Sequence, residues 1–471
     1  MKYALVTFGC RVNQADSLRL EEDLRASGAE EAASADADLV IVNTCSVTAT
    51  ADQGARQTIR RIARENPRAR IVATGCYATR CEEDVAALPN VVRVVRNDEK
   101  LTFLRDAGPE RPGLHVVPAG PERPGLQVVP AGPERPGLHV VPAGPERPGL
   151  QLRRADLSGP PHVLSGPPSG PCGKAIEPGI AGRTAFTIRA QTGCEERCAF
   201  CIIPKTRGAS RSLPIDVLVG EVRRVAAAGF KEVAIAGVHL GSYGRDLGPR
   251  ASLLGLLRAL DAVDADVTYR ISSLEPMDCT RPIVDLVAGS GRFLPHFHLP
   301  LQHASDRVLA AMRRPYTLDY YRRLVDAIHA RLPHVAIGSD MLVGFPGETD
   351  EDFARNLAYL PSSPLTHLHV FPYSDRPGTE ATQFRHKVPP AVIRDRGAEL
   401  RRIGGELAAR FRASQIGTVR PGLTLEDGTL VVTDNYLKVK VPAGLRRNIR
   451  VRVRIAASES GLTGVIEPAG A

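Results

Sequence analysis

The sequence has no apolar run of membrane-spanning length, and no signal-peptide cleavage site follows its first residues. Residues 1–8 instead have the apolar character of a β-strand. The nine cysteines, an odd number scattered over 471 residues, do not resemble the disulfide framework of a secreted protein. We therefore expect a protein without a membrane anchor in a reducing, cytoplasmic location.

Lysine is scarce, since only eight of the 61 basic residues are lysine and the rest are arginine. The formal net charge of +9 favours a polyanionic partner such as nucleic acid. The excess of arginine fits phosphate recognition and genome composition equally well. Apolar residues at 43% and charged residues at 24% are ordinary for a globular protein, and the length predicts about three domains.

The most informative motif lacks a fourth cysteine. Cys194, Cys198 and Cys201 form a Cys-x3-Cys-x2-Cys pattern, which suits three corners of a [4Fe–4S] cube. One iron then has no protein ligand and is open to bind another molecule. Zinc is the alternative, but a structural zinc site has four ligands, and His239, the nearest downstream histidine, lies too far along the chain to share this loop.

The first 107 residues predict a Rossmann-like α/β domain. Residues 3–8, 37–43 and 70–74 read as strands of a parallel sheet, with helices expected over 15–27 and 50–66. Each strand ends at a cysteine: Cys10, Cys45 and Cys76. Ligands of open α/β sheets collect at the carboxyl ends of the strands, so the three thiols are expected to converge. Three unrelated buried thiols are the alternative.

Residues 108–178 predict an extended linker. Residues 108–151 repeat a twelve-residue unit with three prolines and two glycines, which excludes helix and leaves few donors for a stacked sheet. A solenoid is therefore disfavoured against a disordered segment of polyproline II type.

Residues 179–411 resume the βα alternation and predict a partial (βα)6 barrel of the TIM type. Its six strands are expected at 185–191, 232–237, 267–273, 296–301, 335–343 and 367–373. The Cys194 loop follows the first strand, on the face where such barrels carry chemistry. Residues 412–471 change to short strands with Gly and Asp turns, which predicts a small β-barrel.

The small barrel contains a basic stretch without any acidic residue. In its last part, arginines alternate with aliphatic residues and so occupy one face of a strand. We expect this face to contact an RNA backbone, with a plain solvated surface as the alternative. The residues concerned are Lys438, Lys440, Arg446, Arg447, Arg450, Arg452 and Arg454.

Several segments resemble the radical S-adenosylmethionine (SAM) methylthiotransferases, in the order that family has them. The amino-terminal matches are Gly-Cys-Arg-Val-Asn-Gln at 9–14, Asn-Thr-Cys-Ser at 43–46 and Thr-Gly-Cys-Tyr at 74–77. The later matches are the Cys194 loop with Ile-Ile-Pro-Lys-Thr-Arg-Gly at 202–208, Ser-Ser-Leu-Glu-Pro at 272–276, Leu-Pro-Leu-Gln at 299–302 and Gly-Phe-Pro-Gly-Glu-Thr at 344–349. The final segment resembles the RNA-binding TRAM module of those enzymes.

The resemblance implies an enzyme with two [4Fe–4S] clusters. Cys194, Cys198 and Cys201 would hold the cluster that cleaves SAM to a 5′-deoxyadenosyl radical, and a second SAM would supply the methyl group. Cys10, Cys45 and Cys76 would hold an auxiliary cluster that carries sulfur. An electron donor such as flavodoxin or ferredoxin and the anticodon arm of tRNA would be partners.

Three further residues are candidates for SAM contacts. Phe200 is expected to pack on the adenine or, alternatively, on the core of its loop. Glu275 lies past a strand end and either reaches SAM or is a solvated turn carboxylate. Gly344 begins a strand-to-helix turn that has a capping box at Thr349 and Asp352. We expect this turn to have a structural role first, and a backbone contact to SAM is the second expectation.

The motif at 9–14 resembles the family branch that modifies N6-threonylcarbamoyladenosine in tRNA, and so do residues 237–244. The alternatives are the branches acting on isopentenyladenosine of tRNA and on a ribosomal-protein aspartate. Glu195 and the pair His303-Ala304 depart from the common family pattern. Two other classes of protein remain as alternatives. A non-catalytic RNA-binding module would make no use of the six cysteines, and a radical SAM enzyme that acts on a small molecule would make no use of the basic barrel.

Overall fold

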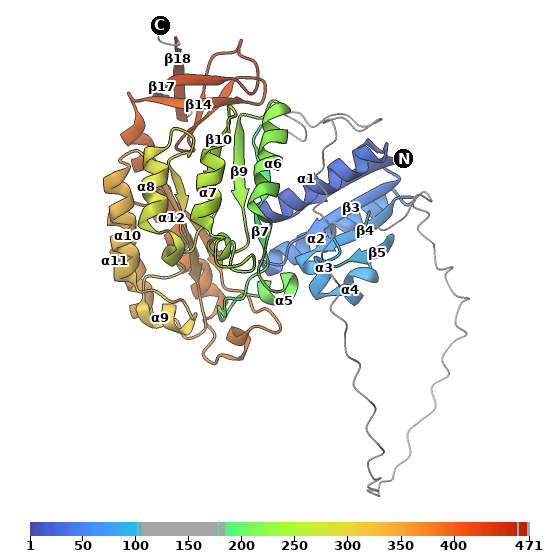
Figure 1. The fold of residues 1–471 in the computed structure, drawn as a ribbon. Coiled ribbons are helices and arrows are strands. Elements are labelled where there is room, and N and C mark those ends of the chain that lie inside the picture. The colour runs from blue at the N-terminus through green and yellow to red at the C-terminus, as the bar shows by residue number, and fades with distance from the viewer. Residues whose placement is uncertain (101–102, 105–177, 179–183, 459–460, 469–471) are drawn as a thin grey trace, which may run out of the picture. The chain divides into compact units, whose positions relative to one another are not determined.

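The computed structural model describes residues 1–100, 103–104, 178, 184–458 and 461–468 (Figure 1). The expected linker, with all four copies of the repeat, lies outside the described residues except for Pro178. The predicted domain boundaries near residues 108 and 179 border the same undescribed segment.

The amino-terminal residues form a five-stranded, fully parallel sheet in the order β2-β1-β3-β4-β5. The strands are β1 (Lys2–Thr7), β2 (Glu30–Glu31), β3 (Leu39–Thr44), β4 (Arg70–Gly75) and β5 (Val91–Val95). The helices are α1 (Arg11–Ala26), α2 (Ala49–Glu65), α3 (Cys76–Arg80) and α4 (Glu82–Ala86). This strand order is that of flavodoxin-like sheets, which bind ligands where β1 and β3 diverge. The predicted parallel-sheet domain is therefore confirmed.

The central residues form six parallel strands, as predicted, divided into two sheets of three. The first has the order β10-β9-β6 and the second β11-β12-β13, and an isolated bridge joins Tyr269 of the first sheet to Phe293, which lies just before β11. The strands are β6 (Phe186–Arg189), β9 (Glu232–Ala236), β10 (Thr268–Ile271), β11 (His296–His298), β12 (Ala336–Val343) and β13 (His367–Pro372). The six strands fit a partial barrel, but hydrogen bonding does not run through them as one continuous sheet.

Helices follow the strands of this central part. The α-helices are α5 (Ile203–Arg207), α6 (Ile215–Ala227), α7 (Leu253–Asp261), α8 (Arg281–Gly289), α9 (Asp306–Ala311), α10 (Leu318–Arg331), α11 (Asp350–Tyr359) and α12 (Pro390–Gln415). The short elements are β7 (Gln191–Thr192), β8 (Arg211–Ser212), η2 (Leu240–Ser242), η3 (Pro276–Asp278), η4 (Leu360–Ser362) and η5 (Glu380–Gln383). Alternate residues of β12, such as Ile337 and Met341, pack into the apolar core with the helices, which turns Asp340 to the opposite face.

The carboxyl-terminal strands form a closed barrel in the order β14-β15-β16-β18-β17. They are β14 (Val419–Leu425), β15 (Leu430–Thr433), β16 (Lys438–Lys440), β17 (Arg450–Ser458) and β18 (Gly461–Glu467). Val453 and Ile455 of β17 are buried, while the arginines between and beside them are exposed, as the alternation predicted. The expected boundary at residue 411 falls inside α12, which continues to Gln415.

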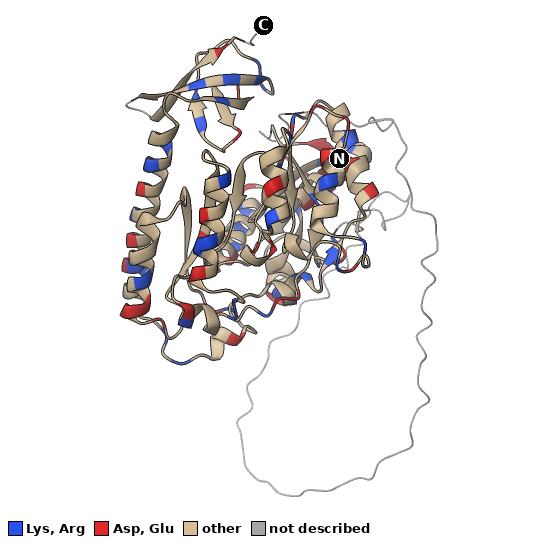
Figure 2. Ribbon diagram, turned by 60° about the vertical axis from the view of Figure 1, so that its left-hand side comes forward, with Lys and Arg blue, Asp and Glu red and all other residues tan. Residues whose placement is uncertain are grey.

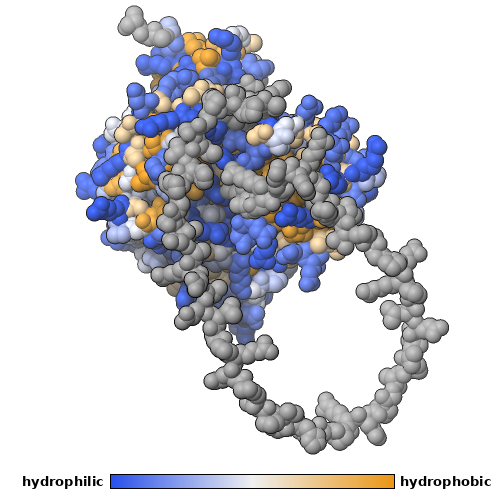
Figure 3. All heavy atoms as spheres, turned by 45° about the vertical axis from the view of Figure 1, so that its right-hand side comes forward, coloured by the Kyte–Doolittle hydropathy of each residue, from blue (hydrophilic) through white to orange (hydrophobic). Residues whose placement is uncertain are grey.

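None of the described helices combines the length and the apolar character that a bilayer-spanning segment requires. On the face seen in Figure 3, hydrophobic residues form small patches that hydrophilic residues separate.

Candidate active site

The structure brings three cysteines together at the carboxyl edge of the amino-terminal sheet. Cys10 follows β1 and caps α1, Cys45 follows β3, and Cys76 is the first residue of α3, directly after β4. Cys45 and Cys76 are buried, whereas Cys10 is exposed. Burial, with the neighbouring Cys10 and Cys76 thiols, raises the pKa of Cys45 to about 11. The three thiols therefore face one another although they come from separate parts of the sequence.

Two glycines allow this close approach. Gly9 has a φ of +92°, and a Cβ there would lie 2.5 Å from the Cys45 Sγ. Gly75 has a φ of +97°, and a Cβ there would lie 2.1 Å from the Thr44 carbonyl oxygen. Both positions thus exclude a side chain for two reasons, the left-handed backbone and the lack of space.

Asparagine and threonine side chains fix the strand ends that carry the thiols. Asn13 Nδ2 donates to the carbonyl oxygens of Phe8 and Thr44, each at 2.9 Å. Thr44 Oγ1 donates to the Thr74 carbonyl at 2.6 Å and accepts from the Ala78 amide at 3.0 Å. These bonds connect the ends of β1, β3 and β4, so the three thiol-bearing turns are held as one unit.

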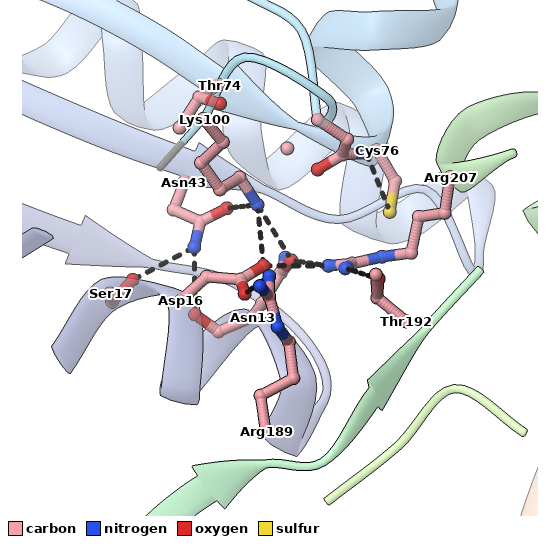
Figure 4. A network of polar contacts seen from close by, with 12 residues as sticks. Asn13, Asp16, Ser17, Asn43, Thr74, Cys76, Lys100, Arg189, Thr192 and Arg207 are labelled. Atoms are coloured by element: carbon pink, nitrogen blue, oxygen red, sulfur yellow. Dashed lines mark hydrogen bonds and ion pairs between the residues drawn. The ribbon is translucent and has the colours of Figure 1, made fainter. Parts of the chain in front are cut away.

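A buried carboxylate beside the thiols collects three cations (Figure 4). Asp16 lies 3.1 Å from Lys100 Nζ, 2.5 Å from Arg189 Nη1 and 3.2 Å from Arg207 Nη2. Asp16 is almost fully buried, which alone would raise its pKa, yet these cations hold the pKa well below its usual range. Arg189 and Arg207 belong to the central part of the chain, so this contact joins it to the amino-terminal sheet.

Arg207 also reaches the thiols themselves. Its guanidinium donates to Asn13 Oδ1 at 2.5 Å and to Thr192 Oγ1 at 3.0 Å, and its positive charge interacts with the Cys76 thiol. Burial disfavours ionisation of Cys76, but Arg207 and Lys100 lower its pKa below the usual thiol value. The Asn97 amide donates to the same sulfur at 3.6 Å. The site therefore favours a thiolate at Cys76.

A second arginine from the central part lies on the Cys45 side. Arg376 pairs with Asp52 of α2 at 2.8 Å, and Asp52 also accepts from Arg80 at 2.5 Å. Arg376 is 4% exposed, and its Nε and Nη2 atoms have no hydrogen-bond partner among the described residues. A buried cation with free donors next to thiols fits an anionic group at this edge.

The second cysteine trio lies in the loop after β7. Cys194, Cys198 and Cys201 are partly exposed, and the Cys201 amide donates to the Cys198 carbonyl at 3.1 Å. Burial raises the pKa of Cys201 to about 12 and also raises that of Cys198. Arg314 donates to the Cys198 Sγ at 3.3 Å and pairs with Glu275. A cation and a carboxylate thus lie directly beside this trio.

His239 belongs to this site in space, although its distance along the chain argued against a place in the same loop. Its Nε2 lies 2.9 Å from Asp278 Oδ2, and its ring interacts electrostatically with Cys194. Burial alone would lower its pKa, but these two partners raise the pKa of His239 to about 10. A positively charged imidazole therefore lies beside this trio.

The geometry of the thiols bears on the choice between zinc and a cluster. A zinc ion needs ligand atoms that lie close together. Among the described residues, one group of three possible ligands has all its ligand atoms within 4.8 Å of one another. This group consists of His298, Asp340 and His369 on β11–β13. Neither cysteine trio is that compact. Sulfurs that share one zinc ion must lie close together, whereas the three thiolates of a cluster bind three different irons. The wider arrangement fits [4Fe–4S] clusters.

The three softer SAM candidates have defined surroundings. Phe200 packs against the apolar cluster around Val308 and Phe345. Glu275 forms an ion pair with Arg314, which in turn donates to Cys198, so Glu275 lies close to this trio. The Gly344 amide already donates to Glu348 Oε2 at 2.6 Å, which leaves it no free donor for SAM.

The Gly344 turn has the structural role that was expected first. Gly344 has a φ of +78°, and a Cβ there would lie 2.3 Å from Ile393 Cγ1. The predicted capping box of Thr349 and Asp352 at the start of α11 is present.

The predicted RNA-binding face divides into paired and unpaired residues (Figure 2 shows the basic residues on the barrel strands in blue). Arg450 pairs with Asp266 of the central part at 2.9 Å, and Arg454 pairs with Glu467 at 2.6 Å. Arg447 donates to the Glu426 carbonyl at 2.6 Å. The remaining residues make no ion pair with other described residues: Lys438, Lys440, Arg446 and Arg452.

Sequence reasoning missed the charged residues that surround both trios. Asp16, Lys100, Arg207, Arg314 and Arg376 have no periodicity or spacing that relates them to the cysteines. Only Arg207 carried a signal, because it lies in the segment at 202–208 that resembles the family motif. The others are identified by contacts between distant segments.

Two family models match this chain. Residues 2–96 match the family described as "Uncharacterized protein family UPF0004", and residues 188–360 match the radical SAM superfamily. Among solved structures, the radical SAM methyltransferase TsrM from Kitasatospora setae is similar, with a TM-score of 0.52, 17% identity, and coverage of 81% of this chain and 73% of that one. The class is therefore a radical SAM enzyme with an additional amino-terminal domain.

Curated relatives narrow the class. The threonylcarbamoyladenosine tRNA methylthiotransferase MtaB of Aquifex aeolicus is 32% identical, covering 93% of this chain and 96% of the relative. The ribosomal protein uS12 methylthiotransferase RimO of Roseiflexus castenholzii is 34% identical, covering 89% and 83%. The tRNA-2-methylthio-N(6)-dimethylallyladenosine synthase of Sorangium cellulosum is 34% identical, covering 89% and 80%. The chain belongs to the radical SAM methylthiotransferases, whose cofactors are SAM and iron–sulfur clusters.

The glycine before Cys76 yields a stability prediction. Gly75→Ala should lower the free energy of unfolding by about 2–4 kcal/mol, because it adds backbone strain of about 1 kcal/mol to a clash with Thr44. Gly28→Ala is the matched control, since Gly28 also has a positive φ but an added Cβ would meet nothing within 4 Å, and only the strain of about 1 kcal/mol applies. Urea unfolding followed by circular dichroism measures both. Equal shifts for the two variants would contradict the steric argument.

Proposed function

We propose that this chain adds a methylthio group to C2 of N6-threonylcarbamoyladenosine at position 37 of tRNA, in the cytoplasm. The observation that carries the proposal is the second thiol trio, Cys10, Cys45 and Cys76, at the edge of a sheet that contacts the radical SAM part. A radical SAM enzyme that only cleaves SAM needs one cluster. A second site with soft ligands and an excess of positive charge suits the storage of sulfur.

The two trios have separate roles in this proposal. Cys194, Cys198 and Cys201 hold the cluster whose open iron binds SAM, and Cys10, Cys45 and Cys76 hold the auxiliary cluster. When bound, the clusters and SAM supply the radical and sulfur chemistry that side chains cannot, because an aromatic C–H offers no useful acid or base handle. A flavodoxin or ferredoxin is the proposed electron donor.

The protein side chains near the first trio bind and orient. Glu275, held by Arg314, is in place to accept from the hydroxyl or amino groups of SAM. His239 carries a positive charge beside Cys194. Phe200 extends the apolar wall of the loop, which helps to exclude water from a reactive site.

The choice of substrate rests on two supports. The motif Gly-Cys-Arg-Val-Asn-Gln at 9–14 resembles the threonylcarbamoyladenosine branch. Five of the curated relatives that match over at least 91% of this chain carry that activity in their names, at 28–32% identity. Relatives from the other two branches are as similar in identity, so the nucleoside product is the decisive observation.

Counting iron tests the assignment of the ligands. Anaerobically reconstituted protein should contain about eight irons, four per cluster. Replacing Cys194, Cys198 and Cys201 with Ala should remove half of the iron and all SAM cleavage. Replacing Cys10, Cys45 and Cys76 with Ala should remove the other half and leave slow SAM cleavage. Replacing Cys81 and Cys279, two cysteines outside the trios, is the control and should change neither quantity. SAM cleavage in the first variant would refute the assignment.

Mass spectrometry of nucleosides tests the substrate. The chain is expressed in a bacterial strain that lacks its own threonylcarbamoyladenosine methylthiotransferase, and tRNA is digested to nucleosides. We expect 2-methylthio-N6-threonylcarbamoyladenosine to appear, and to be absent with the Cys194→Ala variant. In strains that lack the other two activities, isopentenyladenosine and the ribosomal-protein aspartate should remain unmodified. Modification of either one instead would move the chain to that branch.

The unpaired basic residues of the barrel test RNA binding. We propose that Lys438, Lys440 and Arg452 contact the phosphates of the anticodon arm, because no acidic side chain among the described residues neutralises them. Replacing all three with Ser should weaken tRNA binding and reduce the slope of log K against log salt by about 2–3. Arg322→Ser, in an exposed pair with Asp319, is the control. An unchanged slope would show that this face is only solvated surface.

Arg450 and Arg454 should contribute less to RNA binding than the unpaired residues, because each already has a carboxylate partner. Their replacement should chiefly affect the packing of the barrel, with Arg450 holding it to Asp266. The same salt titration separates the two groups of residues.

A further inference from the structure

The charges around the amino-terminal thiols do not balance within the protein. Two carboxylates, Asp16 and Asp52, lie in this region, and both are buried. They are paired with five cations: Lys100, Arg189, Arg207, Arg80 and Arg376. The cations therefore outnumber the carboxylates by three, and a thiolate at Cys76 offsets one of these positive charges. Buried charge without a counterion is strongly unfavourable, so an anion is required in the same space.

The cations nearest the thiols come from the other domain. Arg207 follows Cys201 by one short helix, α5, and contacts Cys76. Arg376 follows β13 and lies close enough to Cys45 for the two charges to interact. Each of the two arginines is 4% exposed, and Arg376 keeps two donor atoms unpartnered among the described residues. The amino-terminal domain supplies the thiols, while the radical SAM domain supplies much of the compensating charge.

We propose that Arg207 and Arg376 are positioning residues that stabilise the charge of the auxiliary cluster and so set its reduction potential from the radical SAM domain. This inference rests on the proposed function, because it assumes that Cys10, Cys45 and Cys76 hold that cluster. A [4Fe–4S]2+ core with three thiolates carries a net charge of about −1, and an anionic sulfur ligand on the open iron adds to it. The excess of positive charge matches such a group.

Two consequences follow from charge alone. Reduction adds an electron to the cluster, so nearby cations favour the reduced form and raise the potential. An anionic sulfur ligand, such as hydrosulfide or methanethiolate, is also attracted to the same cations. Removing either arginine should therefore lower the potential and weaken the binding of the sulfur anion.

The experiment uses the full chain with Cys194, Cys198 and Cys201 replaced by Ala, so that only the auxiliary cluster remains visible. Redox titration followed by electron paramagnetic resonance gives its midpoint potential, and hydrosulfide titration followed by the same spectrum gives its affinity. Arg207→Gln and Arg376→Gln should each shift the potential to a more negative value and weaken hydrosulfide binding at least several-fold. Arg281→Gln is the control, because Arg281 is 91% exposed on α8.

Conservative variants separate charge from structure. Arg207→Lys keeps the charge but loses the forked hydrogen bonds to Asn13 and Thr192, and it should recover most of the potential. If Arg207→Gln does not bind a cluster, the midpoint potentials and hydrosulfide affinities of Arg207→Lys and Arg376→Gln still test the inference. A potential and an affinity equal to the parent in both Gln variants would overturn the inference. A parent that binds no cluster would instead refute the ligand assignment in the proposed function.

Discussion

The contact of one buried carboxylate with three cations holds the parts of this protein in register. Asp16 leaves water at a cost of several kcal/mol, and only partners in excellent geometry offset that cost. Lys100 supplies one of them from the end of the amino-terminal domain, and Arg189 and Arg207 supply the others from the central part. Removing Asp16 would leave three cations without their carboxylate partner, which makes this position far more critical than a surface ion pair.

The same contact explains why the active site needs both domains. Asn13 joins the Asp16 group to the thiol-bearing turns, because it accepts from Arg207 and donates to the carbonyls of Phe8 and Thr44, close to Cys10 and Cys45. A change at Arg207 is therefore transmitted to the turns through one side chain. The positions of the thiols therefore depend on how the two domains pack against each other.

Much of the fold was predictable from the sequence because its signals are local. The runs at 37–43 and 70–74 are apolar and β-branched, and the structure has β3 and β4 there within two residues. The alternation of Arg and Val along 450–455 set the two faces of β17. Cysteine spacing drew attention to the Cys194 trio, and cysteines at the ends of three expected strands drew attention to the other, since thiol chemistry depends on the residue type itself.

The remainder was not predictable because it depends on contacts between distant segments. Asp16 and Arg207 are 191 residues apart, and Asp52 and Arg376 are 324 apart. No pattern within a segment identifies which of many arginines becomes buried. The basic stretch of the barrel shows the same limit, because it contains no acid of its own and Asp266 comes from another domain to pair with Arg450. His239 likewise reaches Cys194 only through the fold.

The two trios differ in sequence spacing, and this difference determines the order in which their thiols come together as the chain folds. Cys194, Cys198 and Cys201 lie within eight residues, so this loop can gather iron while the chain is still unfolded or newly synthesised. Cys10, Cys45 and Cys76 meet only after three strands have paired, and their counter-charges arrive only with the second domain. Under the proposed assignment of ligands, the auxiliary site is therefore complete only after both domains have folded, later than the loop of the other trio.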